Sequence, residues 1–135
     1  MSETDIPADV SHLIFEKIDS VEQLEVLLIL RTAVPASKSR EQISSELRSS
    51  VSSVSSRLVG LQNAGLIQIS PEDPDSYIFK PETPELEATV NRLTEIYKVR
   101  RHRIFELIFS PLKKGRHFAD AFMMNKQNKK GEGNG

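Results

Sequence analysis

The 135 residues predict a mainly α-helical fold with a small β-hairpin and a long helix near the C-terminus. Three observations lead to this prediction. Apolar residues recur at helical spacing through most of residues 20–110, and capping residues separate the segments. Two short alternating runs, at 66–70 and 77–80, flank a turn-rich segment. Hydrophobic residues make up 38% of the chain and aromatic residues only 6%, which favours a Leu-, Ile- and Val-rich core in a single folded unit.

The N-terminal part is expected to be an arm followed by the first strong helix. Residues 1–18 form this arm, and its segment SHLIFEKI, residues 11–18, is predicted to be a short helix. Ser20 and Gln23 have the spacing of a capping box, so the next helix should begin at residue 21. Pro35 ends that helix, and Ser37–Lys38 is predicted to be a loop. The apolar stripe of this helix comprises Val21, Leu24, Leu27 and Leu28, and it continues to Arg31.

Two shorter helices follow, each with a clear N-terminal signal. Ser39 and Gln42 repeat the capping-box spacing, and the helix after them carries Ile43 and Leu47 on one face. Ser49 or Ser50 caps the next helix, and Gly65 ends it. Four residues of that helix lie on one face and are assigned to the core: Val51, Val54, Leu58 and Leu61.

The C-terminal half is predicted to contain the hairpin and one long helix. The strands Leu66–Ser70 and Tyr77–Lys80 are joined by the turn formers PEDPDS, and residues 19–81 form the main domain. Thr83–Pro84–Glu85 opens a helix that runs to about Phe109, and residues 82–110 are expected to serve dimerisation. Such a helix is roughly 39 Å long, so its far half should need a partner. The expected interface residues are Leu86, Val90, Leu93, Tyr97, Arg100, Ile104 and Leu107.

Composition excludes several classes of function. The chain has no Cys, its three His residues are scattered, and no nucleophile elbow or Gly-rich phosphate loop is present. We therefore expect no enzyme activity, no metal and no cofactor. The polar start is unlike a signal peptide, and the longest apolar stretch, Val26–Leu30, is too short to span a membrane. A cytoplasmic protein with no membrane partner is the expectation.

The segment EQISSELRSSVSSVSSRLVGLQNAGLIQI, residues 41–69, carries a family resemblance. It resembles the helix-turn-helix and first wing strand of the MarR-like and ArsR-like bacterial transcriptional regulators, and the order of the flanking helices extends the resemblance to about residues 19–110. The resemblance implies a winged helix-turn-helix that binds double-stranded DNA as a homodimer, with a positioning helix, a tight turn and a recognition helix. The matching positions are Ser50, Ser52, Val54, Ser55, Leu58, Leu61, Ala64, Gly65, Leu66 and Ile67.

The face opposite the predicted core of the recognition helix supplies the candidate DNA contacts. Its short hydroxyls and its N-terminal backbone N–H groups can bind phosphates or reach base edges. Arg57 is the best single candidate, and Lys38, Arg40 and Arg48 could neutralise phosphates around it. The same serine-rich face is also typical of a helix surface that merely faces solvent. The candidates on the helix itself are Ser50, Ser52, Ser53, Ser56 and Arg57.

Three departures from the family pattern keep a second function open. Arg48 stands where relatives usually have Gly in the turn, and Val59 stands where they are often basic or polar. The wing tip carries Glu72, Asp73 and Asp75, which would repel phosphate. The alternative is therefore a protein-interaction module that uses the acidic wing or residues 111–124.

Most of the positive charge lies late in the chain. Residues 91–135 contain 11 Lys and Arg against 4 Asp and Glu, although the net charge of the whole chain is −1. The run from Lys98 to Arg103 is expected to flank DNA in a dimer, to contact an acidic partner surface, or simply to face solvent. Residues 111–135 are predicted to be a short amphipathic segment followed by a disordered tail.

Overall fold

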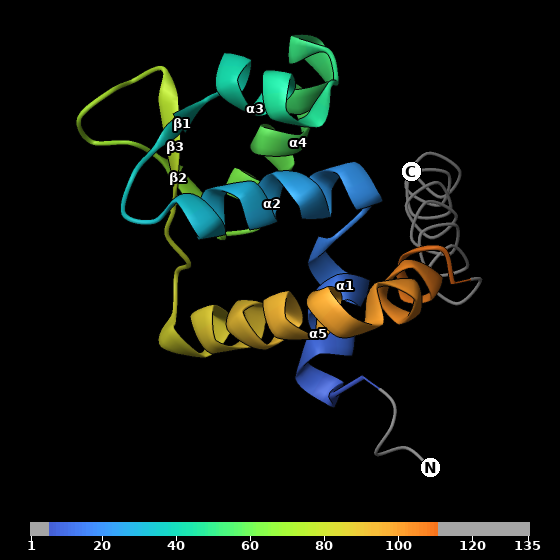
Figure 1. Ribbon diagram of the computed structural model, residues 1–135. Coiled ribbons are helices and arrows are strands. Elements are labelled where there is room, and N and C mark those ends of the chain that lie inside the picture. Colours follow the sequence, from blue (N-terminus) through green and yellow to red (C-terminus); the bar gives the residue numbers. More distant parts are fainter. Residues whose placement is uncertain (1–5, 111–135) are drawn as a thin grey trace, which may run out of the picture.

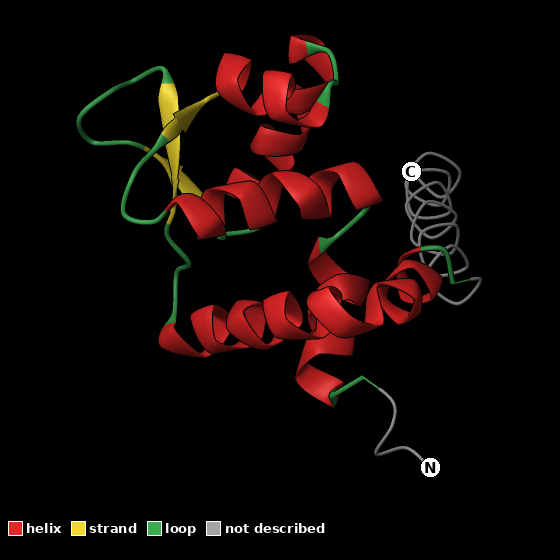
Figure 2. Ribbon diagram, viewed as in Figure 1, coloured by secondary structure: helices red, strands yellow, loops and turns green. Residues whose placement is uncertain are grey.

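The computed structural model describes residues 6–110, which form five helices and a small sheet (Figure 1). The acidic arm before residue 6 and the segment at 111–135 lie outside the described residues. Figure 2 shows that helices dominate and that the sheet occupies one end of the molecule. The elements are α1 (Ala8–Lys17), α2 (Val21–Ala33), β1 (Lys38–Ser39), α3 (Arg40–Leu47), α4 (Val51–Asn63), β2 (Ile67–Ile69), β3 (Ser76–Phe79) and α5 (Pro84–Ile108).

The helices are arranged in two groups that share one core. Helix α4 packs mainly on α2, and α5 packs mainly on α1, which crosses it (Figure 1). Helix α2 belongs to the first group and also contacts α5, so it joins the two groups. The order of α2, α3, α4, hairpin and long final helix is that of a winged helix-turn-helix, as predicted.

The sheet has three antiparallel strands rather than the predicted two. Its order is β1-β3-β2, with Lys38 opposite Tyr77 and Ile67 opposite Phe79. The prediction of a loop at Ser37–Lys38 is therefore wrong at Lys38, which begins β1. A two-residue strand has no periodicity of its own, and only its pairing with the distant β3 reveals it.

Local capping signals place most helix starts correctly. Ser39 and Gln42 form the complete capping box at the start of α3, and Ser50 is the N-cap of α4. The Ser20 side chain accepts a hydrogen bond from Gln23 N at 3.1 Å. The Gln23 side chain, however, accepts from Asp19 N at 2.5 Å instead of from Ser20, so this box is displaced by one residue.

The buried face of α4 matches the prediction at three of its four positions. Val54, Leu58 and Leu61 are fully buried, whereas Val51 is 38% exposed and does not belong to the core. A helical side chain covers the turn that precedes its own Cα. Val51 is the first residue of α4, so no preceding helical turn lies beneath it.

Helix α5 begins as predicted and then bends. Thr83 is the N-cap and Pro84 the first helical residue, but Arg100 has non-helical angles, φ −135° and ψ 43°. The prediction of one uninterrupted helix that runs to about Phe109 is therefore wrong at Arg100. A charged group is costly to bury, and the kink leaves Arg100 half-buried while Tyr97 and Ile104 on either side are buried.

The far half of α5 already has a partner within the chain. Ile104 is fully buried and Ile108 is 4% exposed, so the expectation that this half stays uncovered in one copy is wrong. Helix α1 packs across α5 and so supplies this partner from within the same chain. No helix among residues 6–110 is both long and apolar enough to cross a membrane.

Candidate nucleic-acid interface

The turn between α3 and α4 has the geometry that a helix-turn-helix requires. Arg48 adopts the left-handed conformation, with φ 58° and ψ 39°. Ser49 N donates to Ser44 O at 3.1 Å, and the Ser44 hydroxyl donates to the Ser49 carbonyl. An Arg in this conformation costs of order 1 kcal/mol relative to Gly. The turn is therefore made in the usual way despite the absence of Gly.

Helix α4 presents three different faces. The first is the buried face of Val54, Leu58 and Leu61. The second faces α2 and contains Ser53, Arg57 and Gly60, where a Cβ would lie 2.9 Å from the Gln23 side-chain nitrogen. The third face is exposed and consists of Ser52, Ser56, Val59 and Asn63. This last set is named the outer stripe below.

A carboxylate from the first turn of α2 organises the second face. Glu22 Oε1 accepts a hydrogen bond from Arg57 Nε at 2.8 Å and another from Ser53 Oγ at 2.5 Å. Hydrogen bonds from Ser49, Ser53 and Arg57, in that order of size, lower the pKa of Glu22 to about 2. The carboxylate therefore stays charged at neutral pH and holds α4 and its preceding turn against α2.

The structure separates the five predicted candidates of the recognition helix. The side chains of Ser52 and Ser56 are exposed on the outer stripe, and Ser50 is exposed at the N-cap, where it accepts from Ser53 N at 3.0 Å. Ser53 and Arg57 are half-buried and turn toward Glu22. Sequence reasoning missed Glu22, because no local spacing links residues 31 and 35 positions apart.

The three cations predicted to contact phosphates lie at the two ends of α3. Arg48 is exposed, Arg40 is half-buried, and Lys38 forms an ion pair with Glu46. The wing tip is acidic, and its Glu72, Asp73 and Asp75 are all exposed. Positive charge on this side is therefore sparse and partly neutralised.

The wing tip is a structured turn. Asp73 accepts hydrogen bonds from Asp75 N at 3.0 Å and from Ser76 Oγ at 2.8 Å. These bonds lower the pKa of Asp73, the backbone bond from Asp75 more than that from Ser76. The negative charge at the tip is therefore fixed in place at neutral pH.

The basic run late in α5 makes most of its contacts within α5. Lys98 pairs with Glu95 at 3.0 Å, and Arg103 pairs with Glu106 at 2.8 Å. The Arg101 guanidinium lies 4.9 Å from the centre of the Tyr97 ring, within cation–π range. The two ion pairs partly neutralise the positive charge of the run, whereas the contact with the neutral Tyr97 ring leaves the charge of Arg101 unchanged.

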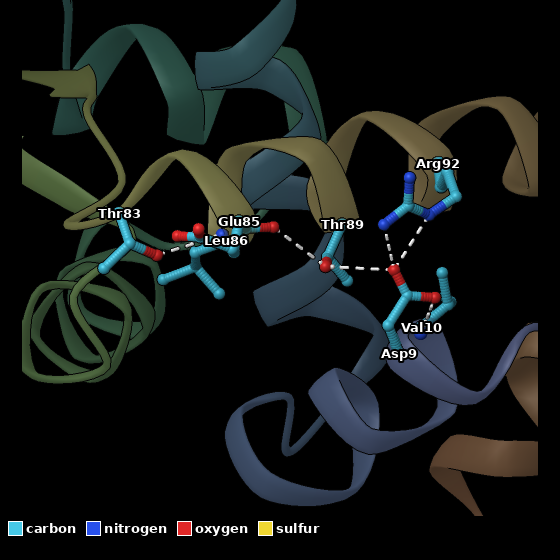
Figure 3. A network of polar contacts seen from close by, with 7 residues as sticks. All are labelled: Asp9, Val10, Thr83, Glu85, Leu86, Thr89 and Arg92. Carbon is cyan, nitrogen blue, oxygen red and sulfur yellow. Dashed lines mark hydrogen bonds and ion pairs between the residues drawn. The ribbon is translucent and has the colours of Figure 1, made fainter.

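Helix α1 links α5 to the end of α4. Asp9 accepts hydrogen bonds from Thr89 Oγ1 at 3.1 Å and from Arg92 Nε at 2.8 Å, as Figure 3 shows. At the other end of α1, Lys17 Nζ donates to the Ala64 carbonyl at 2.8 Å. A cation at a helix C-terminus complements the helix dipole. Helix α1 therefore contacts both α5 and the last turn of α4.

Other surface features offer little chemistry. Among residues 6–110, no three His, Cys, Asp or Glu side chains come close enough together to hold a metal ion. An open groove of about 580 Å³ lies between α2, α3 and α5, and its lining includes Leu28, Leu47 and Tyr97. No constellation of nucleophile and base accompanies it.

Comparison with known proteins gives only distant similarity. No family model matches the chain, and no curated protein matches it. Solved structures do match. A MarR family transcription regulator is 20% identical, with a TM-score of 0.48, over 95% of this chain and 83% of its own. A mutant of S. aureus MepR bound to an oligodeoxyribonucleotide is 18% identical, with a TM-score of 0.48, over 87% and 86%.

A third similar structure is a transcriptional regulator of Thermotoga maritima. It is 19% identical, with a TM-score of 0.46, over 94% of this chain and 87% of its own. The predicted resemblance to ArsR-like regulators gains no separate support from these structures. The winged helix-turn-helix assignment therefore rests on the geometry of the chain itself.

Proposed function

We propose that this chain is a DNA-binding transcriptional regulator of the MarR-like kind that acts in the cytoplasm as a homodimer on double-stranded DNA. The observation that carries the proposal is the geometry of residues 39–67. A capped α3, a left-handed turn at Arg48 and a capped α4 are followed directly by the hairpin. In this arrangement the second helix enters the major groove.

The candidate residues have different roles in this proposal. Ser50, Ser52 and Ser56 lie near the N-terminus of α4, where hydroxyls and free backbone N–H groups meet the groove. Arg40, Arg48 and Lys38 contact phosphates around them. Arg57, held through Nε by Glu22, directs its two terminal nitrogens to the DNA backbone rather than to a base. Ser53 supports this arrangement from the α2 side.

The proposed dimer uses the parts of α5 that one chain leaves accessible. Val90, Leu93, Tyr97 and Ile104 are buried within a single copy, whereas Leu86, Arg100 and Leu107 are half-buried. We assign the interface to these last three residues and to the surface of α1 beside them. Two recognition helices would then contact successive major grooves about 34 Å apart.

The first test is selection from a random duplex library at about 50 mM salt, with the mass of the complex measured in the same buffer. We expect a pseudo-palindromic site bound by two copies of the chain. Failure to enrich any duplex, or a bound mass of one copy, would contradict the corresponding part of the proposal.

Arg57→Ala tests the proposed phosphate contact on the selected site. We expect weaker binding to all sequences and a salt dependence shallower by about one unit per recognition helix. Thermal unfolding in parallel serves as the control, because Arg57 also contacts Glu22. Unchanged affinity and salt dependence would remove Arg57 from the interface.

A second candidate function is a protein-interaction module with little DNA binding. The exposed acids of the wing tip and the Lys38–Glu46 and Glu22–Arg57 pairs favour it, because they reduce the positive charge near α4. No duplex binding at about 50 mM salt, combined with a stoichiometric complex lost on replacing Glu72, Asp73 and Asp75 by Ser, would establish it.

A further inference from the structure

The recognition helix has no free cation on its outer stripe. Arg57 is the one Lys or Arg in α4, and it lies on the face toward α2 with Nε bonded to Glu22. Direct readout of guanine usually relies on a bidentate Arg or Lys. The outer stripe instead offers the hydroxyls of Ser52 and Ser56 together with the side chain of Val59.

Val59 is an apolar side chain at the centre of this polar stripe. It is 54% exposed, and it lies three residues after Ser56 and seven after Ser52, so the three share one side of α4. Leu58 and Leu61, both fully buried, supply the core contacts of this part of the helix. The fold therefore gives Val59 no packing role of its own.

The neighbours of Val59 on the N-terminal side of the stripe are short, whereas Asn63 lies one turn later toward the C-terminus of α4. Ser52 and Ser56 extend only one atom beyond Cβ, so they do not hold α4 away from a surface that it approaches. The isopropyl group of Val59 can therefore make van der Waals contact with the floor of a groove. The major groove presents one apolar group there, the C5 methyl of thymine.

We propose that Val59 reads a thymine methyl group, which makes it a specificity-determining residue of the recognition helix. The inference rests on the proposed function, since it requires α4 to enter the major groove. It predicts that each selected half-site contains an invariant thymine where the middle of α4 lies.

The test removes the two sides of this contact separately. Each thymine of the selected site is replaced in turn by deoxyuridine, which lacks only the methyl group, and binding is measured for the wild-type protein and for Val59→Ala. For one thymine in each half-site, a single replacement should reduce the affinity of the wild type about three- to fivefold, which is the effect of one buried methyl group. Val59→Ala removes the contact from both half-sites of the proposed homodimer, so it should lose about the square of that factor on the thymine site and show no further loss on the deoxyuridine site.

Val34→Ala is the matched control. Val34 is 49% exposed at the C-terminal end of α2, away from the proposed DNA and dimer contacts, so the same chemical change there should alter neither binding nor the response to deoxyuridine. Thermal unfolding of both variants should match that of the wild type, because both side chains lie at the surface.

Two outcomes would overturn the inference, and they are distinguishable. Selective duplex binding with no thymine whose methyl effect depends on Val59 would reject the readout while leaving the proposed function intact. Absence of any duplex binding by the wild type at low salt would reject both.

Discussion

Two carboxylate–arginine links join early helices to later ones, and they differ in burial. Glu22 and Arg57 have side-chain exposures of 21% and 35%, and Asp9 and Arg92 have exposures of 36% and 52%. In both links the carboxylate accepts from the arginine Nε at 2.8 Å. The Nε distance is thus the same, and although a terminal nitrogen of Arg92 also donates to Asp9, more water reaches that pair. We expect the Glu22 link to contribute more to the stability of the fold.

The position of the donors and the size of the pKa shift also separate the two links. Ser49, Ser53 and Arg57 lower the pKa of Glu22 to about 2, whereas Arg92 is the main cause of the lowered pKa of Asp9. The Glu22 link therefore fixes the face of α4 that lies toward α2, together with the turn before α4. The Asp9 link holds two neighbouring residues of α5, Thr89 and Arg92, against α1 (Figure 3).

The largest expected effect is on acid stability. The pKa of Glu22 is lowered on folding from 4.5 to about 2. A group of this kind stabilises the fold fully above its unfolded pKa, and its contribution is lost as the pH falls from about 4.5 toward 2. That contribution is at most about 3 kcal/mol. Between pH 6 and pH 2, the free energy of unfolding measured in urea should therefore fall less for Glu22→Gln than for the wild type. The same fall in both proteins would contradict this prediction.

A double-mutant cycle compares the two links at neutral pH. We expect a coupling free energy of about 1–2 kcal/mol between Glu22 and Arg57, and less than about 1 kcal/mol between Asp9 and Arg92. The substitutions are Glu22→Gln with Arg57→Gln, and Asp9→Asn with Arg92→Gln. The measurement is the free energy of unfolding in urea at pH 7. Equal couplings would mean that burial does not distinguish the links.

The smallest expected effect is on salt dependence. High salt screens exposed charges more than half-buried ones, and the Debye length is about 3 Å at 1 M salt. Raising NaCl from about 0.05 M to 1 M should therefore reduce the Asp9–Arg92 coupling by a larger fraction than the Glu22–Arg57 coupling. The cycle is simply repeated in the second buffer. A greater loss at Glu22 would reverse the ranking of the two links.

The parts of the fold that sequence predicts are those set by near neighbours. The caps at Ser39, Ser50 and Thr83 depend on residues three positions away, and Gly65 ends α4 with φ +79° as its left-handed conformation requires. A Cβ at Gly65 would also meet the Glu82 side chain at 2.3 Å. Such signals lie within a few residues and can be recognised directly.

The parts that sequence misses depend on distant pairing. Strand β1 exists because β3 offers hydrogen bonds 37 or more residues later in the chain. The role of Glu22 depends on the way α2 crosses α4, which no spacing within either helix specifies. The sequence defines the exposed side of α4 only as the side opposite the predicted core, so it cannot separate the face toward α2 from the outer stripe. Ser53 and Arg57 therefore fall into one predicted group with Ser52 and Ser56.

Helix α1 acts mechanically as a strut between the two ends of the molecule. Its first turn holds Arg92 and Thr89 through Asp9, and its last residue, Lys17, holds the Ala64 carbonyl at the end of α4. Ten helical residues span about 15 Å, so the two sets of contacts lie at opposite ends of one short helix. The position of the last turn of α4 relative to α5 is therefore fixed in part by the length of α1, and not only by the wing.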